Sequence, residues 1–397
     1  MDIFDGYYYK SCKRFMSLCG LWPEQNNKSR YLRLIVFVIF NASLAVPQLI
    51  LLIQQFGKDM AITFENSVSV MFALGVFAKY LVAFVNKKRL SSLLVTIAKD
   101  WQTVTDRKER EILTKNTAQG RLLLIIYTYY IHGAWVLYTL MPFLPLALDY
   151  MLPLNDSRPV LMPFYANYLF FEQSDYHYWA CGHIAVSYLA PLVLFCGLDT
   201  IYVISVKHTC GLFEIVCRRL ETLLKSEKGQ QLSKLPDNPD LVMKLSETIQ
   251  LHNDTIGCCD LLENSFNLCF LMVNCMSVVT IALTCVYILF VYSDLFKLIR
   301  IVAFLVGLIM HLLYLNWVGQ QIINSSEQVF ISAYFSDWYL IPNSTKKFIN
   351  IIMIRSLVPC TLTSGKLANL SMENFGIVIH IYDISYIYND KWILCWK

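Results

Sequence analysis

Residues 34–56, LIVFVIFNASLAVPQLILLIQQF, contain no charged side chain. A run of about 20 apolar residues is long enough to cross the hydrocarbon core of a membrane as a helix. Five further runs of similar length and apolarity follow in the chain, at Ile62–Val85, Leu122–Leu148, Ile184–Val206, Leu268–Phe290 and Ile301–Ile323. The sequence therefore predicts at least six membrane-spanning helices.

The composition agrees with a membrane protein and excludes an ordinary soluble one. Of the 397 residues, 56% are hydrophobic and 16% are charged, and the mean hydropathy is +0.47. Soluble domains carry about 25% charged residues, and a soluble chain this apolar would expose large apolar patches. We predict an all-α membrane protein with seven transmembrane helices. The seventh is expected at about Leu370–Tyr388, where Glu373 and Asp383 interrupt the apolar run.

The distribution of Lys and Arg predicts the orientation of these helices, because cytoplasmic segments of membrane proteins are enriched in them. The arm before the first span has six, the segment 87–121 has nine, the segment 207–244 has seven and the segment 324–368 has four, together 26 of the 33. The opposite side has six, and Lys79 lies inside the second span. We therefore predict a cytoplasmic N-terminus and an extracellular C-terminus, the reverse of a G-protein-coupled receptor.

Helical extensions of spans four to seven are predicted to project into the cytoplasm. A helix that starts near Asp240 and continues through the fifth span to Tyr292 would be about 80 Å long. The hydrocarbon core is only about 30 Å thick, so the remainder needs partners for its apolar face. The segment Asn324–Trp338 after the sixth span is similar. The extension of the fourth span has an apolar stripe at helical spacing, formed by Leu212, Phe213, Val216, Leu220, Leu223 and Leu224.

These features divide the chain into four parts. We expect a cytoplasmic N-terminal arm at 1–33, spans one to six with a ligand pocket at 34–323, a cytoplasmic anchor segment at 324–368, and the seventh span with the C-terminus at 369–397. Within the anchor segment, Lys346, Lys347 and Arg355 either contact anionic lipid headgroups or form a solvated helix face.

Four short motifs occur along the chain in a fixed order. The first is a basic amphipathic stretch ending in GLWP, at 12–23, and the second runs from Asp100-Trp101 to Gly120-Arg121 before the third span. The third is His252-Asn253 followed by LLE at 261–263. The fourth is LTSGK at 362–366 with SMENFG at 371–376. Together, and in this order, the four motifs resemble the insect odorant receptor family.

The resemblance implies an odorant-gated, non-selective cation channel. It implies a tetramer in which an odorant-tuning subunit joins a shared co-receptor, in the plasma membrane of olfactory sensory neuron dendrites. It also implies a pore lined by the seventh span, for which Glu373, Phe375, Ile379 and Asp383 are the candidates. After about Ile379 the chain departs from the apolar ending of the family. Either these last residues line an aqueous pore, or the coding sequence ends in a misjoined exon.

Aromatic side chains of spans two, three and four are the candidates for an odorant pocket. A small volatile molecule needs a mostly apolar pocket with one or two polar groups that orient it. Thr128, Ile131 and Trp135 are spaced to share one helix face. The other candidates are Phe72, Tyr138, Tyr188 and Phe195. The alternative for each aromatic side chain is ordinary helix packing or contact with lipid.

Lys79 and Asp199 are the two charged residues that we expect to pair inside the membrane. Each lies eight residues before a lysine at the cytoplasmic end of its span, so both should lie at a similar depth. Intramembrane charges usually find partners. The alternative is that the Lys79 ammonium reaches the cytoplasmic surface.

No motif of an enzyme, metal site or nucleic-acid-binding module stands out, and we expect no cofactor. The 13 cysteines are scattered through apolar runs without metal-ligand spacing and are interpreted as small core residues. The alternatives for the function are a gustatory receptor of the same superfamily, a metabotropic receptor with seven spans, and a transporter, although no internal repeat is visible.

Overall fold

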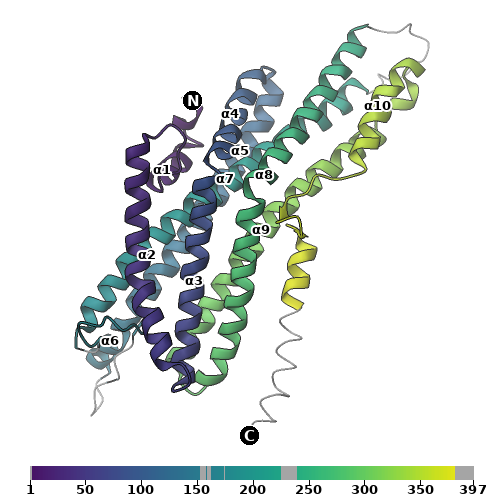
Figure 1. Ribbon diagram of the computed structural model, residues 1–397. Helices are drawn as coiled ribbons and strands as arrows, with labels where there is room; N and C mark the ends of the chain where they lie inside the picture. The colour runs from purple at the N-terminus through teal and green to yellow at the C-terminus, as the bar shows by residue number, and fades with distance from the viewer. Residues whose placement is uncertain (1, 153–157, 159–161, 174, 225–238, 381–397) are drawn as a thin grey trace.

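The structure, a computed structural model, describes residues 2–152, 158, 162–173, 175–224 and 239–380. Almost all regular structure in these residues is helical (Figure 1). The N-terminal arm contains a short 3₁₀ helix η1 (Asp2–Asp5) and helix α1 (Lys10–Leu18). The remaining elements, in chain order, are α2 (Asn27–Gln55), α3 (Met60–Val85), α4 (Lys87–Thr103), α5 (Arg107–Leu140), η2 (Met141–Phe143), α6 (Leu144–Met151), α7 (His177–Leu223), α8 (Pro239–Val291), α9 (Leu295–Tyr334), η4 (Trp338–Leu340), α10 (Asn343–Ser356), β1 (Thr363–Ser364) and β2 (Ala368–Asn369).

Six of these helices are long and apolar enough to span a membrane, which confirms the first six predicted spans. They are α2, α3, α5 continued by α6, α7, α8 and α9. Asp side chains fix the starts of three of them by accepting hydrogen bonds from the first free backbone N–H groups. Asp59 accepts from Ile62 at the start of α3, Asp106 from Lys108 and Glu109 at the start of α5, and Asp294 from Lys297 at the start of α9.

The third span differs from the prediction at its outer end. We expected one continuous helix over Leu122–Leu148, but α5 ends at Leu140 and the chain continues through η2 into α6. Pro142 and Pro145 lie at the starts of these two short elements. Proline cannot donate a helix hydrogen bond and its ring clashes with the preceding turn, so two prolines three residues apart favour a break of the long helix in this segment.

Helix α7 is the central element of the bundle. It is buried along most of its length and contacts α5, α8 and α9 as well as α2. Its last turns carry the predicted apolar stripe, in which Phe213, Val216 and Leu220 are fully buried. This burial accounts for the apolar pattern, since the extension beyond the span needed a protein partner for that face.

Helices α8 and α9 confirm the predicted extensions. Helix α8 begins at Pro239 and runs for 53 residues, and α9 runs for 40 residues to Tyr334. In Figure 1 the beginning of α8, the end of α9 and α10 project together beyond the rest of the bundle. We call the end of the molecule that carries α1, α4 and α10 the anchor end, and the end that carries α6 the loop end. The described parts of the predicted Lys- and Arg-rich segments gather at the anchor end.

A small hairpin joins the anchor to the last described helix. Strands β1 and β2 pair antiparallel, with Thr363 opposite Asn369. Gly365, at a φ of 62°, allows the tight turn between them, and its N–H donates to the carbonyl of Asn267 on α8 at 3.0 Å. Residues 372–380 are helical, and Ser371 caps this helix by accepting from the Asn374 N–H at 3.1 Å. This helix lies at the start of the segment predicted as the seventh span, whose second half, with Asp383, lies outside the described residues.

Candidate ligand-binding site

Five aromatic rings form a row that runs through the bundle from the loop end inward. Tyr138 lies 5.4 Å from Phe164, which stacks on Tyr188 at 5.5 Å. Phe72 continues the row at 6.3 Å from Tyr188 and 6.3 Å from Phe195. These separations are typical of favourable aromatic pairs. We call these five residues the aromatic row.

The aromatic row brings together four of the seven side chains predicted for the ligand pocket. Phe72 comes from α3, Tyr138 from α5, and Tyr188 and Phe195 from α7. The fifth ring, Phe164, belongs to the connection between the third and fourth spans and was not predicted. The abundance of aromatic residues in that connection was the available signal, but a loop residue has no helical register that would orient it.

The other three predicted pocket residues lie on α5. The spacing of Thr128, Ile131 and Trp135 places them on one face of this helix, and all three are half-buried. The indole Nε1 of Trp135 is buried and has no hydrogen-bond partner within the described residues. A buried donor without a partner costs free energy, so this N–H is available to an acceptor on a bound molecule.

A polar cluster of four side chains lies at the inner end of the aromatic row. The Lys79 ammonium is 2.6 Å from Asp199 Oδ1, which confirms the predicted pair. Asp199 Oδ2 accepts from the Tyr127 hydroxyl at 2.6 Å and is 3.1 Å from His311 Nε2. Both charges are almost fully buried, so each depends on the other for stabilisation. We call Lys79, Tyr127, Asp199 and His311 the inner cluster.

The inner cluster is in direct contact with the aromatic row. The Lys79 ammonium lies 4.2 Å from the centre of the Phe195 ring, and the His311 ring is 5.2 Å from the same ring. A cation over an aromatic face is attracted to the ring electrons. A change in the position of Phe195 would therefore change the contact that its ring makes with the Lys79 ammonium of the Lys79–Asp199 pair.

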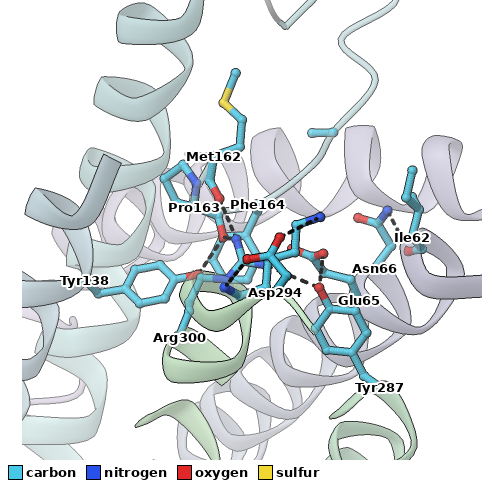
Figure 2. Close-up of polar contacts among 12 residues, drawn as sticks. Ile62, Glu65, Asn66, Tyr138, Met162, Pro163, Phe164, Tyr287, Asp294 and Arg300 are labelled. Atoms are coloured by element: carbon cyan, nitrogen blue, oxygen red, sulfur yellow. Dashed lines mark hydrogen bonds and ion pairs between the residues drawn. The ribbon is translucent and has the colours of Figure 1, made fainter. Parts of the chain in front are cut away.

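A second polar cluster lies at the loop end of the row (Figure 2). The Glu65 carboxylate forms an ion pair with Arg300 and accepts a hydrogen bond from Tyr287. We call Glu65, Tyr287 and Arg300 the outer cluster. Sequence reasoning missed it, although Glu65 within an apolar span was a signal that a cationic partner exists. The guanidinium also donates to the carbonyls of Met162 and Pro163.

Two cavities border other parts of the described bundle and lie outside the aromatic row. The larger, about 480 Å³, is bordered by the N-terminal arm and by α4 and α5, and its lining includes Tyr9 and Trp101. Burial raises the pKa of Tyr9 to about 12, so its hydroxyl stays protonated. The smaller, about 10 Å³, lies beside Arg300 and Pro163. Neither of these two cavities is lined by a predicted pocket residue.

An apolar contact links the aromatic row to the predicted pore helix. Ile281 of α8 and Leu308 and Leu312 of α9 form a buried cluster against which both Phe72 and Phe375 pack. Phe375 was predicted to line a pore, but within this chain its ring faces the bundle. Glu373 is exposed on another side of the same helix, and Ile379 is half-buried.

The chemistry of the site suits an apolar or aromatic molecule of small size. No group of three or more His, Cys, Asp or Glu side chains in the described ranges could hold a metal ion. The rings of the aromatic row offer dispersion contacts, and the Trp135 indole offers one hydrogen-bond donor. Such a combination fits binding rather than acid–base or nucleophilic chemistry.

Comparisons with known proteins agree on one family and one fold. The family described as 7tm odorant receptor matches residues 59–381. The insect olfactory receptor OR5 from Machilis hrabei in complex with eugenol has a similar structure, with a TM-score of 0.75 and 12% identity over 96% of this chain and 98% of that one. A second structure of OR5 from Machilis hrabei has a TM-score of 0.73 and 14% identity, covering 96% of this chain and 97% of that one. No curated protein matches the sequence.

Proposed function

The chain belongs to the insect odorant receptor family, and on that premise we propose that it is the odorant-tuning subunit of a non-selective cation channel. It is an odorant receptor, a multi-pass membrane protein of a family of ligand-gated channels and not of enzymes. The proposed location is the plasma membrane of olfactory sensory neuron dendrites. The proposed stimulus is a small volatile organic molecule.

The proposed topology has seven spans with the N-terminus in the cytoplasm. Its support is that 26 of the 33 Lys and Arg residues belong to the arm, the segments 87–121 and 207–244, and the anchor segment. Helices α1, α4 and α10, which belong to three of these segments, lie at one end of the molecule (Figure 1). The helix at 372–380 would begin the seventh span. Lys346, Lys347 and Arg355 would lie near anionic lipid headgroups.

The observation that carries the proposal is the aromatic row with a polar cluster at each end. We propose that the odorant binds between these rings and the α5 face that carries Thr128, Ile131 and Trp135. The Machilis hrabei OR5 structure in complex with eugenol supports this class of ligand. An aromatic volatile with one oxygen acceptor matches the stacked rings and the free Trp135 N–H.

We propose that opening is transmitted through the apolar cluster of Ile281, Leu308 and Leu312. A ligand that moves Phe72 changes the packing of this cluster, and Phe375 lies against the same cluster. Binding opens the channel only if the ligand prefers the open arrangement. We assign Phe375 to this coupling and propose Glu373, Ile379 and Asp383 as pore residues, contributed by a tetramer that includes the shared co-receptor.

The test is to record odorant-evoked currents from cells that express this chain with and without a co-receptor, using a panel of volatile molecules. We expect currents only with the co-receptor, and we expect Tyr188→Ala to shift the potency of the best agonist. Tags at each terminus, probed on intact cells, test the orientation. An extracellular N-terminus, or responses that need G-proteins and produce no direct current, would overturn the proposal.

A further inference from the structure

We propose that Phe164, a residue of the extramembrane connection, forms the outer wall of the odorant site and limits the length of the molecules that bind. We further propose that Arg300 is the positioning residue that holds this wall in place. This inference rests on the proposed function. It adds a specificity-determining residue outside the spans, in a segment where sequence reasoning placed none.

The first step is that Phe164 is an integral part of the aromatic row. Its ring stacks on Tyr188 at an interplanar angle of 13° and lies 5.4 Å from Tyr138. The neighbouring phenylalanine in the same connection, Phe170, is 93% exposed. The connection therefore points the Phe164 ring into the bundle and the Phe170 ring out of it.

The second step is that the backbone on both sides of Phe164 is fixed by buried polar groups. The Tyr138 hydroxyl and the Arg300 guanidinium both donate to the Pro163 carbonyl, at 2.6 Å and 3.1 Å. The Gln173 side-chain amide donates to the Phe164 carbonyl at 2.8 Å and accepts from the Ala166 N–H at 2.9 Å. Three successive carbonyls, from Met162 to Phe164, thus have partners. Figure 2 shows Arg300 beside the first two.

The third step is that Arg300 cannot easily release the loop. Its guanidinium is buried and held by Glu65, which also binds Tyr287 of the neighbouring helix. Charge-assisted hydrogen bonds are about twice as strong as neutral ones. The outer cluster therefore sets the depth to which the segment at 162–164 is inserted, and Phe164 sets where the site ends, beside Tyr138 and Tyr188.

This arrangement predicts the class of ligand that binds and how the selection changes. With Phe164 in place, the site takes compact volatiles, such as single-ring aromatics and short alkyl chains. Loss of the ring leaves space at the loop end, and longer chains gain contacts while compact molecules lose a stacking partner. The preferred chain length, rather than overall sensitivity, is the property that should shift.

The first experiment needs no agonist. A cysteine replaces Phe72, one ring further inward, and its labelling rate by a membrane-impermeant thiol reagent is measured on intact cells. We expect labelling to be on the order of tenfold faster when Phe164→Ala is added, because two ring contacts no longer close the site. Phe170→Ala, the matched control in the same connection, should leave the rate unchanged. Equal rates in all three backgrounds would overturn the proposal.

The second experiment measures tuning with primary alcohols from butanol to decanol, and with eugenol as an aromatic probe. Phe164→Ala should shift the most potent alcohol to a longer chain and weaken eugenol, whereas Phe170→Ala should match the parent. If Tyr188→Ala alters the responses but Phe164→Ala behaves like Phe170→Ala, only the wall proposal fails. If no variant in the row alters any response, the proposed odorant site fails, while the labelling rates still decide whether Phe164 closes it.

The role of Arg300 is tested in a pair of variants that leaves no isolated buried charge. Glu65→Gln combined with Arg300→Gln should reproduce the chain-length shift of Phe164→Ala. If Arg300 acts only by holding the loop, adding this pair to Phe164→Ala should produce little further shift. A full additive shift, or a pair that lowers surface expression without changing the preferred chain length, would show that Arg300 stabilises the fold and does not position the wall.

Discussion

Replacing Lys79 by methionine should destabilise the folded receptor by about 3–5 kcal/mol, the usual cost of breaking a buried ion pair by removing one partner. The Lys79–Asp199 contact is 2.6 Å long, and the two side chains are only 3% and 2% exposed. At that separation the attraction is about 6 kcal/mol for an effective dielectric constant near 20. The substitution removes this attraction and leaves the Asp199 charge buried, with only the Tyr127 hydroxyl and His311 beside it.

The assay is the thermal midpoint of the detergent-solubilised protein, followed by fluorescence-detected size exclusion, for Lys79→Met, Asp199→Asn and the double variant. Each single substitution should lower the midpoint. The double variant should recover much of the loss, because no unpaired charge remains and the new side-chain amide oxygen can still accept from Tyr127. Replacing the exposed Lys58 by methionine is the control for loss of a positive charge and should leave the midpoint unchanged.

One result would refute this reasoning. If Lys79→Met leaves the midpoint unchanged and the double variant is no more stable than Asp199→Asn alone, the two charges do not stabilise each other. Lys79 would then reach the cytoplasmic surface with its ammonium hydrated, and the contact with Asp199 would carry no free energy.

Two further substitutions test the connection between the bundle and the seventh span. A Cβ on residue 319 would lie 2.5 Å from the Leu370 carbonyl oxygen. Gly319→Ala should therefore displace the start of the last helix and reduce agonist-evoked current at equal surface expression. Gly133→Ala is the control and should not reduce the current, because a Cβ there would meet no other atom within 4 Å. Phe375→Ala should raise the agonist concentration needed for half-maximal current on the order of tenfold, since it deletes the ring that packs on the apolar cluster of Ile281, Leu308 and Leu312. Ile377, on the same helix, is 53% exposed, and Ile377→Ala should leave this concentration unchanged. An equal effect of Phe375→Ala and Ile377→Ala would contradict the proposed coupling.

The sequence predicted those features that depend on one helix at a time. The six spans, the start of α8 near Asp240 and the extension of α9 follow from apolar runs and breaks within single segments. The Lys79–Asp199 pair was predicted because both residues lie equally far from the cytoplasmic ends of their spans. Depth is readable from sequence in this way when a charged flank marks the membrane boundary.

Features that depend on how helices rotate against one another were not predicted. Glu65 and Arg300 are 235 residues apart, and nothing in either segment specifies that the two faces meet. Phe164 has no periodic neighbours that would indicate a buried face. The pore role predicted for Phe375 stays a prediction, whereas its contact with Ile281, Leu308 and Leu312 depends on the packing of α8 against α9, which no local pattern encodes.

Helix α8 connects the outer cluster with the hairpin before the last helix as one continuous helix. Between Glu263 and Tyr287 it contains neither glycine nor proline, and these residues lie about 36 Å apart along its axis. At one end the Tyr287 hydroxyl donates a hydrogen bond to the Glu65 carboxylate. At the other end the Glu263 carboxylate accepts from the Thr363 N–H at 2.7 Å and so holds the hairpin that precedes the last helix. Because α8 has no break between these two contacts, we expect a displacement at one of them to change the position of the other. A small molecule that displaces α8 beneath the loop would thus also move the start of the last helix.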